Sequence, residues 1–101
     1  MSYALKTVFS KTGNMRFVSH LDLVRLFQRA SRRASVPVAI TEGFSPRLKI
    51  SILKALKLGM ESVAEEAVFF MTRSVGPEDF VNSMNGKLPE GVRIIKAEKT
   101  G

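Results

Sequence analysis

The fold is decided by residues 16–34, RFVSHLDLVRLFQRASRRA, because one face of this stretch is apolar and the other is basic. Its apolar residues recur at helical spacing and form one stripe: Leu23, Leu26, Phe27, Ala30 and Ala34. Such a stripe predicts an amphipathic helix that buries one side against a core. The rest of the chain must therefore supply the surface that this helix covers.

The sequence also predicts where this helix begins and ends. Ser19 is a good N-cap residue, and Asp22 three positions later makes an S-x-x-D pattern that resembles a capping box. Pro37 disfavours helical backbone at the residue before it, so the helix cannot extend past Val36.

Strand patterns flank the helix on both sides. Before it, YALKTVFS (3–10) predicts a strand, KTGN (11–14) a turn, and MRFVS (15–19) a short continuation of strand. After it, RLKISIL (47–53) alternates apolar and polar residues, which predicts a half-buried strand with a basic outer face. The remaining assignments are a short strand at 36–40, a loop at 41–46, a connection at 54–62, a central strand at 64–72, a helix within 74–89 and a last strand at 91–99.

This order of elements is typical of one fold class. Strand, helix, one or two strands, a further strand, helix and strand matches the ferredoxin-like βαββαβ sandwich, an α+β fold. We expect an antiparallel sheet with both helices on one face. The chain has 101 residues, so we expect one domain over residues 1–101.

The composition excludes several kinds of site. The chain has no cysteine and one histidine, so disulfides, thiolate metal sites and iron–sulfur ligation by Cys are excluded, and no metal or other cofactor is expected. No apolar run approaches the ~20 residues of a membrane span. The N-terminus has no signal-peptide core, so we expect a cytoplasmic protein without a membrane partner.

The net charge of +7 is unevenly distributed. Residues 1–57 hold eleven of the sixteen basic residues and only two of the nine acidic ones. A basic half of this kind indicates contact with a polyanion on one side of the molecule. The alternative is a basic surface that serves solubility.

The polar side of the first helix carries most of the clustered charge. Arg25, Arg29, Arg32 and Arg33 fall along one side of a helix with 3.6 residues per turn, and only Asp22 is close enough in sequence to pair with one of them. Arginine forks bind phosphate in a bidentate manner. We expect this face to bind a nucleic acid or another partner, unless it is solvated and pairs with acids such as Glu61 or Glu65.

Three further residues would extend the patch if the strands lie beside this helix: Arg16, Arg47 and Lys49. Phe44, in the loop EGFSPR, either packs over the sheet or stacks on a base beside Arg47. The aromatic motif of the common RNA-recognition module is absent.

Catalysis has only weak support in the sequence. His20, in the first helical turn, is the one candidate general base, but no second histidine is available as an acid. Glu61, Glu65 and Glu66 are candidates for paired carboxylates on spacing alone, and a solvated acidic edge is the simpler interpretation. We therefore expect a protein that is not an enzyme.

Three stretches of the chain resemble the radical SAM-linked domain of unknown function. They are KTGNMRFVSHLDLVRLFQRASRRASVPVAITEGFSPRLKIS (11–51), LGMESVAEEAVFF (58–70) and LPEGVRIIKAE (88–98). That domain is bacterial and occurs alone or fused to the C-terminus of radical SAM proteins. The matching motif positions are Arg16, Phe17, Ser19, His20, Asp22, Arg25, Arg29, Arg32, Arg33, Gly43, Phe44, Pro46 and Lys49. Two positions depart from the pattern, at Leu48 and Lys57.

The resemblance implies an accessory domain that works with a radical SAM partner, and it leaves open that the chain is the N-terminal part of a longer protein. Our first hypothesis is a non-catalytic domain that presents a basic face to RNA or a ribonucleoprotein. The second is a protein-interaction domain that docks on an acidic partner or on the radical SAM enzyme. The third is a small metal-independent RNA-processing enzyme that uses His20. The expected partner-binding residues are Arg16, Arg25, Arg29, Arg32, Arg33, Phe44, Arg47 and Lys49.

Overall fold

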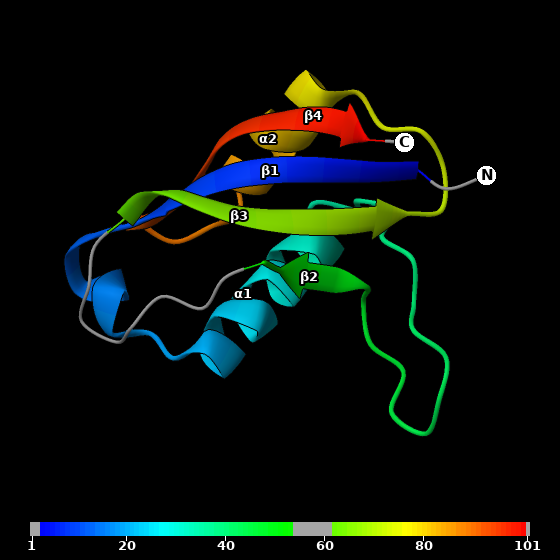
Figure 1. The fold of residues 1–101 in the computed structure, drawn as a ribbon, viewed down its shortest axis with the longest axis horizontal. Helices are drawn as coiled ribbons and strands as arrows, with labels where there is room; N and C mark the ends of the chain where they lie inside the picture. Colours follow the sequence, from blue (N-terminus) through cyan, green and yellow to red (C-terminus); the bar gives the residue numbers. More distant parts are fainter. Residues whose placement is uncertain (1–2, 54–61, 101) are drawn as a thin grey trace.

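The computed structural model of the chain describes residues 3–53 and 62–100. Its elements are β1 (Tyr3–Lys11), the 3-10 helix η1 (Gly13–Phe17), α1 (His20–Arg33), β2 (Ile50–Ile52), β3 (Ser62–Met71), α2 (Pro77–Asn85) and β4 (Val92–Thr100). The four strands form one antiparallel sheet in the order β2-β3-β1-β4 (Figure 1). This confirms the predicted ferredoxin-like α+β sandwich.

The centre of the sheet is the pair β1 and β3. Leu5 pairs with Phe69 and Thr7 pairs with Ala67, and all four side chains are buried. The Thr7 hydroxyl donates a hydrogen bond of 2.9 Å to the Ala67 carbonyl, so this buried polar group is satisfied. The expectation that residues 64–72 form a central strand is confirmed, since β3 lies between β2 and β1.

Both helices cover the same face of the sheet (Figure 1). The ring of Phe27 on α1 lies 5.0 Å from that of Phe9 and 5.6 Å from that of Phe69, both edge to face. The ring of Phe80 on α2 lies 4.9 Å from the same Phe69 ring. Edge-to-face pairs contribute about 0.5–1.5 kcal/mol each beyond the burial of their surface. Phe69 therefore joins the two helices across one core.

The second helix is fixed to the last strand by one amide side chain. Asn85 donates from Nδ2 to the Ile94 carbonyl and accepts from the Ile94 N–H, both at 2.8 Å. The helix begins with Pro77 in its first turn, where the missing N–H costs no hydrogen bond. It ends at Asn85, so the expected helix within residues 74–89 is confirmed.

The prediction that residues 15–19 continue the first strand is wrong, because residues 13–17 form η1 instead. The chain turns there because Gly13 adopts a φ of +60° and the Thr12 N–H donates to the Gly91 carbonyl at 2.8 Å. Gly91 itself has a φ of +98°, and a Cβ at this position would lie 2.6 Å from Met15 Cγ. Glycine is therefore required where β4 begins beside η1.

One predicted strand is absent, and another is shorter than expected. Residues 36–40 make only isolated bridges, from Val38 to Met71 and from Ile40 to Leu48. This segment makes two backbone hydrogen bonds at the end of β3, from the Ala39 N–H to the Phe70 carbonyl and from the Thr72 N–H to the Pro37 carbonyl, and then leaves the edge of the sheet. Of residues 47–53, only 50–52 form strand β2, although the predicted alternation of half-buried and exposed side chains is present from 47 to 52. Residues 54–61 of the predicted connection lie outside the described part of the chain.

Within residues 3–53 and 62–100, no helix has the length and apolar character that crossing a membrane would require.

Candidate functional site

The first helix has a defined hydrogen-bonded start and end. At its start the Ser19 Oγ accepts a hydrogen bond of 3.1 Å from the Asp22 N–H, which is the geometry of an N-cap. After its end at Arg33, Ser35 adopts a φ of 55° and the Val36 N–H donates to the Ser31 carbonyl at 2.9 Å. The chain therefore leaves the helix in a tight, hydrogen-bonded turn.

One side of α1 is buried in the core and the other is exposed. The buried residues are Leu23, Phe27, Ala30 and Ser31. The exposed side carries Arg25, Arg29, Arg32 and Arg33, which we call the arginine face. These four residues and Gln28 line a shallow hollow of about 410 Å³.

The charge of the arginine face is largely uncompensated. Asp22 Oδ1 lies 3.7 Å from an Arg25 guanidinium nitrogen, and both side chains are more than half exposed. Within residues 3–53 and 62–100, this is the only ion pair that any of the four arginines makes. An exposed pair at this distance contributes little, about 0–1 kcal/mol. Arg29, Arg32 and Arg33 are therefore available to an external anion.

Packing brings a cation that follows the second helix to this face. A second hollow of about 390 Å³ is lined by Arg29 and Arg33 and by residues 86–89, which follow α2 and include Lys87. Sequence reasoning missed Lys87, because nothing in the pattern around it indicates that the end of α2 lies beside the end of α1. Its exposed side chain extends the basic surface to the segment that follows α2.

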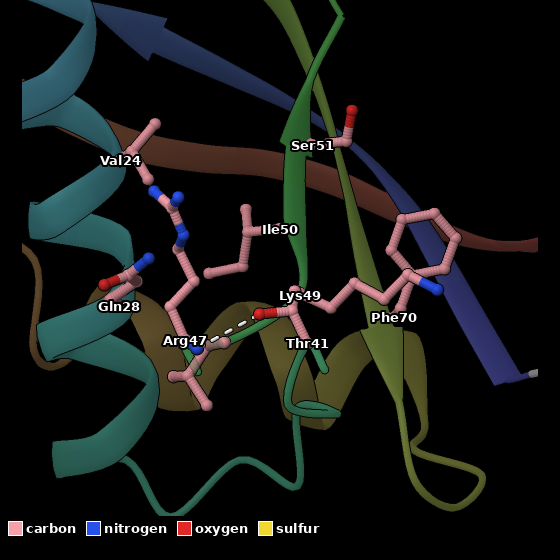
Figure 2. A pocket seen from close by; sticks show the side chains of 9 residues that line it. Val24, Gln28, Thr41, Arg47, Lys49, Ile50, Ser51 and Phe70 are labelled. Atoms are coloured by element: carbon pink, nitrogen blue, oxygen red, sulfur yellow. Dashed lines mark hydrogen bonds between the residues drawn. The ribbon is translucent and has the colours of Figure 1, made fainter. Parts of the chain in front are cut away.

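A third hollow continues the surface toward the edge of the sheet. It measures about 460 Å³ and is lined by Val24, Gln28, Thr41, Arg47, Leu48, Lys49, Ile50, Ser51 and Phe70. The Arg47 N–H donates to Thr41 Oγ1 at 3.1 Å, which closes the base of the intervening loop. In Figure 2 the Arg47 side chain points toward α1, whereas Lys49 points toward Phe70. The Lys49 ammonium lies 4.8 Å from the centre of the Phe70 ring.

Two of the expected binding residues lie apart from these hollows. Arg16 donates from a guanidinium nitrogen to the Gly13 carbonyl at 2.9 Å, and its guanidinium lies 4.4 Å from the centre of the Phe17 ring. Phe44 is fully exposed in the loop between Thr41 and Arg47 and lines none of the three hollows. It does not pack over the sheet, which was one of its two expected placements.

His20 is exposed in the first turn of α1 and also lies outside the three hollows. Glu65 and Glu66 do not form a carboxylate pair, because adjacent strand residues point to opposite faces of a sheet. Glu65 is buried on the helix-covered face, and Glu61 lies outside the described residues.

Glu66 is engaged on the other face of the sheet, where its Oε2 lies 3.0 Å from the Lys6 Nζ. The pKa of Lys6 is raised above the ordinary value of 10.5, mainly because Lys6 donates a hydrogen bond to Glu66 and secondly because Glu66 is negatively charged. In the described part of the chain, no three His, Cys, Asp or Glu side chains gather as metal ligands would.

The comparisons with known proteins give one match. The family described as "Uncharacterized protein conserved in bacteria (DUF2344)" matches residues 5–101. Searches of curated proteins and of solved structures found no match to this chain. Since the match covers nearly the whole sequence, the chain belongs to this bacterial family of uncharacterized proteins.

Proposed function

We propose that this domain is a non-catalytic accessory domain that binds RNA or a ribonucleoprotein through the arginine face of α1. The observation that carries the proposal is the exposure of Arg25, Arg29, Arg32 and Arg33 around one hollow, with Asp22 as their only ion-pair partner in the described residues. Like charges at helical spacing destabilise a helix by a few tenths of a kcal/mol per pair, roughly 0.2–0.5 kcal/mol. A phosphate between two arginines removes this repulsion and accepts bidentate hydrogen bonds from both.

The position of the charge supports a large polyanion over a small anion. The hollows beside the arginine face are shallow and open to solvent along α1, and they continue onto the end of α2 and the loop at Arg47. A binding surface spread over several elements matches a ligand whose phosphates repeat along a chain.

The proposal includes a radical SAM enzyme as the partner that acts on the bound RNA. This part rests on the resemblance of the RFVSHLDL and EGFSPR motifs to the radical SAM-linked domain. The chain has no cysteine, so the cluster of such an enzyme would be held by the partner, while this domain would recruit or orient the substrate.

The test is a charge reversal on the arginine face. Arg29→Glu combined with Arg33→Glu should weaken RNA binding by about tenfold or more in a filter-binding titration at several salt concentrations. For a single strand, the salt slope should also fall by ~0.7 for every phosphate that the variant no longer neutralises. The melting temperature should change little, because both side chains are exposed.

A matched control is Arg93→Glu combined with Lys96→Glu, which changes the net charge equally on exposed positions of β4, at the sheet edge opposite β2. This control should retain most RNA affinity. Equal losses in both variants would mean that only net charge matters and would refute the assignment to the arginine face. Unchanged binding by the arginine-face variant, or preferential binding to an acidic protein over RNA, would refute the proposal as well.

A further inference from the structure

The three hollows share residues and form one surface. Gln28 lines both the first and the third, and Arg29 and Arg33 line both the first and the second. We call the cations along them the basic track: Lys87, Arg33, Arg32, Arg29, Arg25, Arg47 and Lys49. Among the described residues, no Asp or Glu lines any of the three hollows. The cations of the track therefore have one ion-pair partner among the described residues, Asp22 beside Arg25.

The basic track bends around the edge of the sheet. Val24 and Gln28 line the third hollow from α1, which covers one face of the sheet. Ser51 and Phe70 line the same hollow from the other face: Ser51 pairs with Val68, and Phe70 alternates with the core residue Phe69. The hollow thus reaches both faces at the edge strand β2, as Figure 2 shows.

An aromatic ring lies at the sheet-face end of the basic track. Phe70 is half-buried, and Lys49 lies above its ring. The Lys49 side chain is exposed, and a cation–π contact at an exposed site is weak. A flat ligand can therefore displace the ammonium from the ring without leaving a buried charge behind.

We propose that the basic track binds single-stranded RNA, with phosphates on the arginines and one base stacked on Phe70; this inference rests on the proposed RNA function. A single strand can follow a path that turns from a helix face around a strand edge, and a stiff duplex cannot. Sites for single strands combine a positive groove along the backbone with aromatic side chains under the bases. The base takes the place of Lys49 over the ring, and the displaced ammonium then lies beside the phosphate of that nucleotide.

The chain has no tryptophan, so one introduced indole reports directly on stacking. Phe70→Trp should lose fluorescence when titrated with an oligouridylate of about twelve nucleotides, a length within the ~4–16 nucleotides that single-strand sites cover. The matched control is Phe17→Trp, since Phe17 is an exposed ring beneath a cation, Arg16, but lies off the track. Binding of the same oligonucleotide should leave the fluorescence of the indole at position 17 unchanged.

A second variant covers the case in which tryptophan does not fit. Phe70→Leu keeps an apolar side chain and should weaken binding of the oligouridylate by about 5- to 150-fold, the range of base–aromatic stacking. Its salt slope should equal that of the wild type, since no charge is lost. Binding of an RNA duplex of the same length should be weak in both proteins.

The outcomes separate this inference from the proposed function. Duplex binding as tight as single-strand binding, or quenching of the indole at position 17 as strong as that at position 70, would overturn the single-strand path and leave the RNA function standing. Quenching in a Phe44→Trp variant but not at position 70 would place the base on the loop and overturn the path as well. If neither RNA binds and a polyglutamate peptide does, both proposals fall.

Discussion

Replacing Gly91 by alanine tests how tightly the start of β4 is packed against η1. A Cβ at this position would lie 2.6 Å from Met15 Cγ, 2.7 Å from the Thr12 carbonyl oxygen and 3.0 Å from Met15 Cβ. The Met15 side chain can move, but the Thr12 oxygen belongs to a backbone fixed by the hydrogen bond from the Thr12 N–H to the Gly91 carbonyl. The backbone at Gly91 also has a φ of +98°, which an alanine rarely adopts.

The expected cost combines these two effects. The backbone conformation costs alanine about 1–3 kcal/mol. Forcing the extra carbon into the contact costs a further ~1–3 kcal/mol, as overpacking does elsewhere. The sum, about 2–6 kcal/mol, is a large part of the ~5–15 kcal/mol that stabilises a typical domain. Gly91→Ala should therefore be severely destabilised.

Gly13→Ala is the matched control, because Gly13 also has a positive φ, +60°, but a Cβ there meets nothing within 4 Å. It should lose only the conformational part, about 1–2 kcal/mol. Urea denaturation followed by circular dichroism measures both, and the midpoint of Gly91→Ala should lie clearly below that of Gly13→Ala with a similar m-value. Equal midpoints for the two variants would show that the close approach of Gly91 to Thr12 does not constrain the fold.

Three further predictions concern the helix cap, the histidine and the sheet ion pair. Ser19→Ala should lower the unfolding free energy by about 1 kcal/mol, since the Asp22 N–H loses its acceptor at the helix start; an unchanged denaturation midpoint would refute the cap. His20→Ala should stay folded and bind RNA like the wild type, because His20 is exposed and lies outside the hollows; RNA cleavage that is present in the wild type and lost in this variant would show an enzyme instead. The raised pKa of Lys6 means that its pair with Glu66 stabilises the fold fully below pH 10.5 and less as the pH rises through the folded-state pKa. The melting temperatures of the wild type and Lys6→Gln should therefore differ at neutral pH and converge at pH values above the folded-state pKa, and a gap that persists there would contradict the pairing.

The fold class was predictable because the main signals are local. The stripe containing Leu23 and Phe27 has the period of a helix, and the alternation at residues 47–52 has the period of a strand. Hydrophobic periodicity reports which side of an element is buried, and the alternation of strands and helices then leaves few topologies. The strand predictions for residues 15–19 and 36–40 were wrong. The backbone of these two segments is set by contacts with residues distant in sequence, near Gly91 and at the end of β3.

The sequence by itself determined the arginine face, since residues three and four apart on one helix are neighbours wherever the helix lies. Only the tertiary structure decided what joins it. Packing of α2 beside α1 brings Lys87 next to Arg33, and the antiparallel pairing of β2 with β3 sets Lys49 over Phe70. Charged and aromatic residues can be read from a sequence. Which elements lie side by side is set by core packing and sheet register. Exposed residues such as Lys87 contribute almost nothing to either, so their neighbours are known only from the tertiary structure.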